Sequence, residues 1–316
     1  MKALAIVGAT ASGKTSLSIE VANRFNCEII CCDSMQIYKY MDIGTAKATA
    51  DERRAVPHHM LDFLSPDHPY SASEYALDAF NIANEITSRK KLPLFCGGTG
   101  LYLEAVRTGR HSNPIEADDE YRALLTEISK EENGIDKLHE MLRQCDEKSA
   151  EAIHKNNVKR VIRALEVYHT TGIRKSEWDE RSKSIPPQID LLSFCIMYED
   201  RDTLYKRIDL RVDEMIKKGL RDEVEFLLNK GYLSSKSTAS QAIGYKEYLE
   251  FFRNEITESE AIEKIKLATR HYAKRQLTWF CAQKNIIPVY ADSNGKLRTA
   301  SEMCSEIEQK AKSFLS

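Results

Sequence analysis

The sequence predicts an α/β protein built on a P-loop NTPase-like parallel sheet with helices on both faces, plus a helical insertion domain. Short apolar runs alternate with helical patterns in the first third of the chain, as expected for parallel strands that are covered on both faces. A glycine-rich loop joins the first run to the first helix, and strand-like runs are missing between Pro114 and Pro187. With 316 residues, the chain has room for about two domains of about 150 residues each.

The elements of the α/β domain are predicted from runs and periodicities along the chain. The apolar run at 2–8 indicates a first strand, and a helical pattern follows it from Ser12 to about Phe25. Further strands are expected at 27–32, 92–98, 190–198 and 286–291. Further helices are expected at 73–90, 202–218, 221–230, 240–253, 258–284 and 301–314.

The segment between the two prolines has a different character. Its charged helical patterns at 119–132, 135–145 and 158–171 include no strand-like run. The strand pattern returns only at 190–198. We therefore predict one P-loop catalytic core made of residues 1–113 and 188–316, with residues 114–187 inserted as a helical domain.

The composition is that of a folded chain, with 42% hydrophobic and 30% charged residues. It excludes collagen-like, fibrous and disordered classes. The formal net charge of −2 would by itself argue against a nucleic-acid-binding protein. Two segments are nevertheless basic: residues 155–175 contain a single acid, and residues 264–284 contain none. The total charge therefore hides two candidate surfaces for a polyanion.

The second basic segment has its charges at helical spacing. Lys266, Arg270 and Lys274 fall on one face at intervals of four residues, where like charges repel one another. A solvated surface is the simpler interpretation, but the repulsion makes contact with RNA backbone the better one. We expect Arg270 and Lys274 to contact RNA.

Several features indicate a protein of the cytoplasm with no membrane segment and no structural metal. No run of about 18 apolar residues exists, and we expect no signal peptide. The eight cysteines form no C-x-x-C pair and no zinc spacing, so we expect free thiols. Adjacent His58 and His59 would point to opposite faces of an extended segment, so a structural role is expected for both.

The loop from Gly8 to Thr15, GATASGKT, matches the P-loop pattern G-x-x-x-x-G-K-[ST] between a predicted strand and a predicted helix. In this pattern the loop N–H groups surround a polyphosphate, the lysine adds a positive charge, and the final hydroxyl can bind Mg²⁺. The predicted strand at 92–98 ends in glycines rather than in a carboxylate, and no N-K-x-D segment is present. Nucleotide-hydrolysing motors and GTPase switches are therefore disfavoured.

Asp33 follows the second predicted strand. Ligands of doubly wound sheets lie beyond the carboxyl ends of the strands, so Asp33 is expected near the P-loop. There it could accept a proton from an attacking group, or it could cap a following helix. We favour the base. Small-molecule kinases also place an acid in this region, so this position does not distinguish a kinase from another transferase.

A set of segments along nearly the whole chain adds a more specific indication. They are GATASGKT at 8–15, DSMQIYKYMDIGTAK at 33–47, PHHMLD at 57–62, LPLFCGGTGLY at 92–102, KRVIRALEVY at 159–168, QAIGYKE at 241–247 and TRHYAKRQLTWF at 269–280. In this order and combination they resemble the bacterial tRNA dimethylallyltransferase (tRNA isopentenyltransferase) family. A generic P-loop kinase would not be expected to share them.

The resemblance implies a reaction and its site residues. A dimethylallyl group would pass from dimethylallyl diphosphate to N6 of the adenosine 3′ to the anticodon, giving N6-isopentenyladenosine. The resemblance assigns the donor diphosphate to Gly8, Thr10, Ala11, Ser12, Gly13, Lys14 and Thr15, with Mg²⁺ at Thr15 as cofactor. It assigns catalysis to Asp33, Lys14 and Thr99. The tRNA anticodon stem-loop would contact Asp33, Ser34, Met35, Gln36, Thr99, Arg122, Lys159, Arg160, Arg163 and Gln241, in addition to Arg270 and Lys274.

One position departs from the family. Some bacterial relatives have arginine where this chain has Gln241, so a phosphate-neutralising role there is in doubt. Three hypotheses follow for the whole chain: a tRNA prenyltransferase, which we favour; a small-molecule P-loop kinase; and an RNA-binding protein without catalysis. Nothing in the sequence indicates an obligate oligomer, and a monomer is expected.

Overall fold

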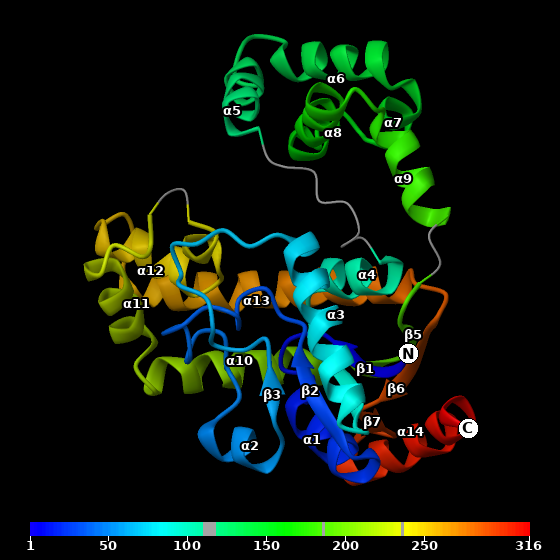
Figure 1. Ribbon diagram of the computed structural model, residues 1–316. Helices are drawn as coiled ribbons and strands as arrows, with labels where there is room; N and C mark the ends of the chain where they lie inside the picture. The colour runs from blue at the N-terminus through cyan, green and yellow to red at the C-terminus, as the bar shows by residue number, and fades with distance from the viewer. Residues whose placement is uncertain (110–117, 185–186, 235–236) are drawn as a thin grey trace. The chain divides into compact units, whose positions relative to one another are not determined.

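Six parallel strands form the central sheet in the order β3-β2-β4-β1-β5-β6 (Figure 1). The computed structural model describes residues 1–109, 118–184, 187–234 and 237–316. The strands are β1 (Lys2–Gly8), β2 (Cys27–Cys31), β3 (His58–His59), β4 (Leu92–Gly97), β5 (Asp190–Met197) and β6 (Ile286–Tyr290). A separate antiparallel hairpin joins β7 (Asp292–Ser293) to β8 (Lys296–Leu297). The predicted α/β class with a parallel sheet is confirmed.

Helices α1 and α14 cover one face of this sheet, and α3 and α4 cover the other. The helices of this unit are α1 (Lys14–Phe25), α2 (Ala50–Ala55), α3 (Ala72–Ser88), α4 (Gly100–Thr108), α10 (Arg201–Lys217), α11 (Leu220–Asn229), α12 (Tyr245–Phe252), α13 (Glu258–Cys281) and α14 (Ala300–Leu315). Four of them, α2, α3, α13 and α14, begin with a Ser or Thr cap and a Glu three residues later that closes a capping box. Each box satisfies N–H groups that have no partner within the helix.

The predicted helix at 240–253 is wrong as a single element. The structure has a short 3₁₀ turn, η2 (Ala239–Gln241), followed by α12. Gly244 lies between them with φ of 96°, a left-handed conformation that a continuous helix does not contain. The short elements β3, α2 and α4 were not predicted, because two to nine residues carry too little periodicity.

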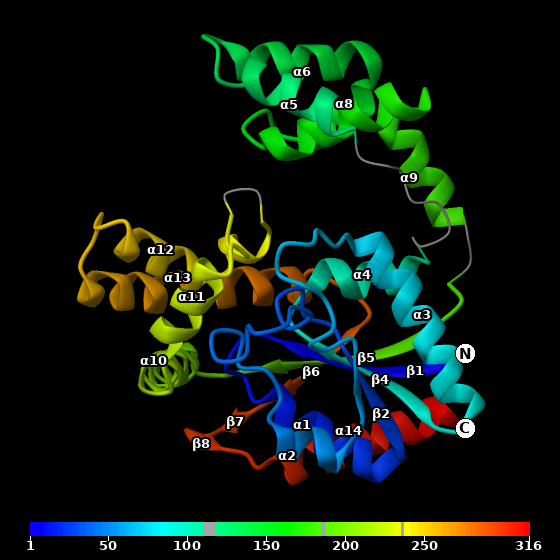
Figure 2. The ribbon, with the colours of Figure 1, turned by 60° about the vertical axis from the view of Figure 1, so that its left-hand side comes forward.

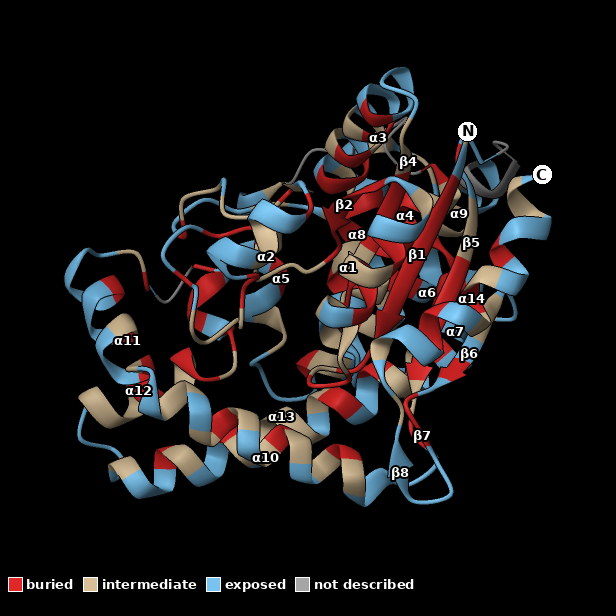
Figure 3. Cartoon of the chain, turned by 90° about the horizontal axis from the view of Figure 1, so that it is seen from below, coloured by how far each residue is buried: buried red, intermediate tan, exposed pale blue. Residues whose placement is uncertain are grey.

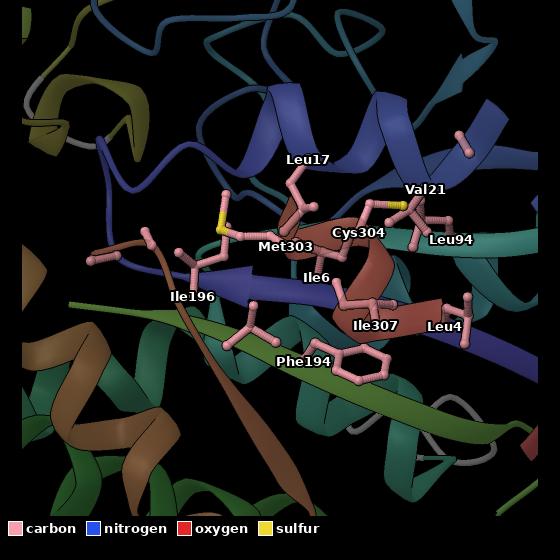
Figure 4. Close-up of a cluster of buried hydrophobic side chains, with 14 of the residues drawn as sticks. Leu4, Ile6, Leu17, Val21, Leu94, Phe194, Ile196, Met303, Cys304 and Ile307 are labelled. Atoms are coloured by element: carbon pink, nitrogen blue, oxygen red, sulfur yellow. The ribbon is translucent and has the colours of Figure 1, made fainter. Parts of the chain in front are cut away.

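The core has two layers, one on each face of the sheet. Successive residues of β1 alternate between them: Leu4 and Ile6 face α1 and α14, whereas Ala5 and Val7 face α3 and α4 (Figures 2 and 4). Because both faces are covered, every residue of β1 after Lys2 is buried (Figure 3). This explains why the strand is a continuous apolar run rather than an alternating one.

A third cluster fixes the loop that follows β2. Ile37, Tyr38 and Met41 of this loop are buried among side chains of α10, α11, α12 and α13. Within the loop, the Nζ atom of buried Lys47 donates to the Tyr38 carbonyl at 2.7 Å and to Asp62 Oδ1 at 2.8 Å. The contact between Lys47 and Asp62 thus joins the segments 33–47 and 57–62, which both belong to the set that resembles the family.

Contacts divide the chain into two units, Met1–Arg107 with Gln188–Ser316, and Thr108–Pro187. The predicted boundary between 113 and 114 falls among residues outside the described part of the chain. The second unit contains α5 (Asp119–Ile128), α6 (Gly134–Cys145), α7 (Glu147–Ala152), α8 (Val158–Thr171) and α9 (Lys175–Ser184). It has its own apolar core, formed by residues such as Leu125, Leu142 and Leu165.

None of the helices in the described parts of the chain has the length and apolar character needed to span a membrane.

Candidate active site

The site is built where three neighbouring strands end. The P-loop follows β1, Asp33 follows β2 and Thr99 follows β4. The N–H of Cys32 donates to the Cys96 carbonyl at 2.7 Å, and the N–H of Thr99 donates back to the Cys32 carbonyl at 3.1 Å. These bonds join the segments after β2 and β4, and the P-loop lies beside them because the neighbouring parallel strand β1 ends at the same edge. The predicted proximity of Asp33 to the P-loop is confirmed.

The P-loop has the backbone geometry that its glycines predict. Gly13 has φ of 96° and Ala11 has φ of 60°, so the chain turns tightly before α1. No side chain caps the first turn of α1, which leaves its N–H groups available to an anion. The Lys14 ammonium folds over the loop and donates to the carbonyls of Gly8 at 3.1 Å and Ala9 at 2.6 Å. Burial lowers the pKa of Lys14, and the Asp33 carboxylate acts in the opposite direction.

Two buried donors beside the loop have no hydrogen-bond partner among the described residues. They are the Ser12 hydroxyl and the Nε atom of Arg211 on α10. A neighbouring arginine of the same helix, Arg207, donates from Nε to the Ala11 carbonyl at 3.1 Å. Burial lowers the pKa of Arg211, against the opposite influence of Asp33. Buried donors are costly when unsatisfied, and an anion in the loop would satisfy both.

Asp33 is held in one orientation. Its Oδ1 atom accepts a hydrogen bond of 3.0 Å from the N–H of Met35. No other hydrogen bond of this carboxylate occurs within the described ranges. The residues that follow form a turn rather than a helix, so the alternative of a helix cap is wrong. The Oδ1 atom stabilises the turn through this bond. The Oδ2 atom has no hydrogen bond among the described residues and can accept a proton.

Thr99 and Tyr272 surround this carboxylate. The Thr99 Oγ1 atom accepts a hydrogen bond of 2.9 Å from the N–H of Ser34, the residue after Asp33. Tyr272 of α13 lies beside the same carboxylate: burial and Asp33 raise its pKa, while hydrogen bonds to Thr99 and Gln276 act against them. Asp33, Ser34 and Thr99 therefore lie together, and Tyr272 lies beside them.

Gln36 was predicted to contact the tRNA, and in this structure its side chain is hydrogen-bonded within the protein. Its Nε2 atom donates to the Thr45 carbonyl at 3.0 Å, and its Oε1 atom accepts from the Cys31 thiol at 3.4 Å. In this structure Gln36 braces the loop at 41–47. Ser34 and Met35 remain half-buried at the site.

The repulsion expected along the basic stripe on α13 is wrong for two of its three residues. Arg270 pairs with Asp209 of α10 at 2.7 Å, and Lys266 pairs with Asp213 at 2.8 Å. The two acids are four residues apart on α10, so they match the spacing of the cations on α13. The expected repulsion is neutralised within the protein, and no RNA is needed to explain Arg270. Lys274 is exposed and has no ion pair among the described residues.

The remaining predicted tRNA residues belong to other segments of the chain than the P-loop, Asp33 and Thr99. Gln241 is exposed on η2, and its side chain donates to Ser240 Oγ at 3.4 Å. The other four belong to the second unit. Lys159 and Arg160 are exposed at the start of α8, whereas Arg122 and Arg163 pair with the buried carboxylate of Glu166 at 2.6 and 2.9 Å.

The histidine and cysteine predictions are confirmed. The Nδ1 atom of His58 is bound to the Val56 carbonyl at 2.7 Å, and the Nε2 atom of His59 to Glu28 at 2.7 Å. The two rings therefore have structural partners. All eight cysteines are free.

Four polar residues of the site were not predicted from the sequence: Arg207, Arg211, Tyr272 and Gln276. For Gln276 a signal was available. Ile265, Ala273 and Phe280 of α13 are buried at helical spacing, and Gln276 lies on the same face and is only 6% exposed. A polar side chain on an apolar face requires specific partners. The two arginines had no comparable signal, because arginines flanking an apolar face are common.

The residues present also suit a metal ion whose other ligands are waters and oxygens of a bound substrate. No cluster of three or more His, Cys, Asp or Glu side chains able to hold a metal occurs in the described ranges. The Thr15 hydroxyl follows Lys14 at the start of α1. Mg²⁺ is commonly held by one such oxygen together with waters and the oxygens of a bound phosphate ester. The site therefore fits Mg²⁺ with a diphosphate better than a metal held by protein alone.

Comparisons with known proteins point to one family. Residues 36–284 match the family model for IPP transferase, and residues 1–62 match that for isopentenyl transferase. The chain is 46% identical to a tRNA dimethylallyltransferase of Thermoanaerobacter sp. (strain X514) over 87% of each chain. It is also 46% identical to one of Acetivibrio thermocellus over 92% of this chain and 91% of that one.

Solved structures agree with these matches. A tRNA isopentenylpyrophosphate transferase of Staphylococcus epidermidis superposes with a TM-score of 0.71 at 40% identity, covering 99% of both chains. A eukaryotic dimethylallyltransferase acting on tRNA superposes with a TM-score of 0.80 at 29% identity, covering 99% of this chain and 79% of that one.

Proposed function

The chain belongs to the IPP transferase family, and from this premise we propose how its site prenylates tRNA. The P-loop binds the diphosphate of dimethylallyl diphosphate, and Asp33 takes the proton from N6 of the adenosine 3′ to the anticodon. A phosphate-binding loop and a carboxylate meet at the same edge of the sheet, and this arrangement is the observation that carries the proposal. The small-molecule kinase hypothesis is not favoured, because the relatives are tRNA dimethylallyltransferases.

The donor side is suited to a leaving diphosphate. Lys14, Arg211 and the Ser12 hydroxyl lie in or beside the loop, and the latter two have unpartnered polar atoms among the described residues. When the bond between the allylic carbon and the diphosphate oxygen breaks, the electron pair leaves with the diphosphate. Donors already aimed at that charge stabilise it most in the transition state.

The acceptor side supplies the base. The N6 amine of adenine is a weak nucleophile, because its lone pair is delocalised into the ring. As the N6–carbon bond forms, the amine becomes acidic, and the free oxygen of Asp33 accepts its proton. The hydrogen bond from Met35 to the other oxygen keeps this carboxylate in place. A base must leave its stack to reach such a site, as in other enzymes that act on nucleobases.

We propose that Mg²⁺ is the cofactor, held by the Thr15 hydroxyl together with the donor diphosphate. When bound, it would neutralise part of the charge on the leaving group. Lys14 and Arg211 act on the same charge from the protein.

We also propose that the second unit contacts the anticodon stem-loop through the exposed cations Lys159 and Arg160. The N-cap of α8, Asn157, makes no side-chain cap hydrogen bond, and the first turn of the helix contains no acid. Cations at a helix N-terminus oppose the helix dipole, so helix stability does not explain them. A phosphate backbone does, since it binds both the cations and the free N–H groups. We further propose a cytoplasmic monomer, consistent with a tRNA substrate and free cysteines.

One incubation tests the proposal against its rivals. The protein is mixed with Mg²⁺, unmodified tRNA, dimethylallyl diphosphate labelled in the dimethylallyl group, and ATP labelled in the γ-phosphate. We expect the dimethylallyl label in tRNA, with one diphosphate released per label transferred. Phosphate label in a small molecule would support the kinase instead, and tRNA binding without any transfer would support a non-catalytic RNA-binding protein.

A further inference from the structure

Gln276 on α13 joins two loops that lie far apart in the sequence. Its Oε1 atom accepts a hydrogen bond of 2.9 Å from the N–H of Thr10 in the P-loop. Its Nε2 atom donates one of 2.9 Å to the carbonyl of Gly98 in the turn after β4. The side chain is 6% exposed, so water does not compete freely for these bonds. One amide therefore bridges the two loops just beyond the point where the paired strands β1 and β4 end.

The sequence of the turn is adapted to this contact. A Cβ atom added at Gly98 would lie 2.2 Å from Nε2 of Gln276, whereas its other neighbours would be no closer than 3.4 Å. Gly98 has no left-handed φ that would itself require glycine. Glycine is therefore needed at this position chiefly to admit the Gln276 side chain.

One of the two loops is proposed to bind the prenyl donor, and the other lies next to the proposed base. Thr10 belongs to the loop proposed to bind the donor diphosphate. Gly98 precedes Thr99, whose hydroxyl binds the N–H of Ser34 next to Asp33. Tyr272, one turn before Gln276 on α13, lies beside Thr99 and Gln276. Gln276 thus connects the P-loop directly to the turn that carries Thr99.

We propose that Gln276 is a positioning residue that holds the donor loop and the acceptor turn in register for transfer. This proposal rests on the prenyl transfer proposed above. It makes the N–H of Thr10 a structural donor to Gln276 rather than a ligand of the diphosphate. Displacements of about 1 Å between reacting groups can reduce a rate by about 100-fold. Loss of Gln276 should therefore affect the chemical step more than the binding of either substrate.

The first test replaces the amide by a side chain of similar length. Gln276→Met should lower kcat by about 100-fold, while KM for dimethylallyl diphosphate and for tRNA changes by less than about 3-fold. Phe280→Leu is the matched control, because Phe280 is buried one turn later on the same face of α13 and only packs. If Gln276 is merely structural, the two variants will lose kcat in proportion to their loss of folded protein.

The second test uses the steric relation between the two residues. Gly98→Ala should lower kcat, because the added methyl group displaces Gln276. The same change should have little further effect in a Gln276→Ala background, where Nε2 is absent. If the two losses instead multiply, Gly98 and Gln276 act independently and the proposal is wrong.

A third readout does not depend on the reaction. Hydrogen exchange of the Thr10 amide and of residues 97–99 should accelerate together in Gln276→Met, and remain unchanged in Phe280→Leu. If this happens in a protein that transfers no prenyl group, the proposed function fails but the link between the loops stands. If wild-type protein transfers the group and the two segments do not loosen together, the link fails.

Discussion

Helices α8 and α13 both come from basic stretches of the sequence, but their cations have different surroundings. On α13, Lys266 and Arg270 are paired with Asp213 and Asp209 of the neighbouring α10. On α8, Lys159 and Arg160 are exposed and have no ion pair among the described residues. A local excess of positive charge therefore does not show where a polyanion binds. What matters is whether acids from distant parts of the chain have already neutralised it.

The different surroundings of the cations also depend on an acid within α8 itself. Its single acid, Glu166, is fully buried and binds Arg122, Arg163 and the N–H of Asp118. Glu166 thus pairs with Arg122 and Arg163, whereas the cations in the first turn of α8 have no ion pair among the described residues.

The exposed cations of α8 should dominate tRNA affinity. We expect Lys159→Ala with Arg160→Ala to weaken tRNA binding by about 10-fold or more. The slope of log affinity against log salt should fall by about 1.4 to 1.8, since two phosphate contacts are lost. Filter binding at several salt concentrations measures both quantities, and single-turnover transfer at saturating tRNA should stay near the wild-type rate. An unchanged salt slope would remove α8 from the interface.

The buried acid of α8 should govern stability. Glu166→Gln should destabilise the helical unit by about 2 kcal/mol, because hydrogen bonds to a charged group are weakened. Burial alone would raise the pKa of Glu166, but hydrogen bonds from Arg163, from the Asp118 N–H and from Arg122 outweigh it, so the pKa is lowered from its ordinary value of 4.5.

A lowered pKa means that this stabilisation is complete above the ordinary value and is lost as the pH falls below it. The difference in unfolding free energy between wild type and Glu166→Gln should therefore shrink from pH 7 towards pH 3. Denaturant unfolding at a series of pH values measures this. A difference that stays constant would contradict the assignment of a charged Glu166.

The stripe on α13 should show the smallest effects on RNA. Arg270→Ala should destabilise the protein by about 1 kcal/mol through loss of its pair with Asp209, and should change tRNA affinity by less than about 2-fold. Lys274→Ala is the matched control on the same helix, with no ion pair to lose among the described residues, and should leave stability unchanged. A loss of affinity in Arg270→Ala as large as that of the α8 variant would restore the original interpretation of the stripe.

The predictable parts of the molecule are those whose conformation depends on residues close together in the sequence. The P-loop pattern fixes the turn between β1 and α1, because Gly13 must adopt a left-handed backbone and Lys14 must start a helix. The position of Asp33 followed from a general property of parallel sheets.

The parts that were not predictable depend on partners distant in sequence. Arg270 is separated from Asp209 by 61 positions, and Gln276 from Thr10 by 266. No periodicity or spacing connects such pairs. The resemblance to a family gave candidate residues, but it did not show that Gln36 binds the loop at 41–47 or that Arg211 lies beside Asp33.

The central claim is that Asp33 acts as the base at a site whose diphosphate and tRNA surfaces are otherwise complete. It is tested most directly by single-turnover transfer with Asp33→Asn at saturating dimethylallyl diphosphate and tRNA, alongside tRNA affinity measured on the same sample. Asparagine preserves the acceptor oxygen for the N–H of Met35 but cannot take a proton. We predict a loss of rate of about 100-fold or more with tRNA affinity within about 2-fold of wild type. A near-normal rate, or a loss of tRNA binding that accounts for the whole decrease, would contradict the account.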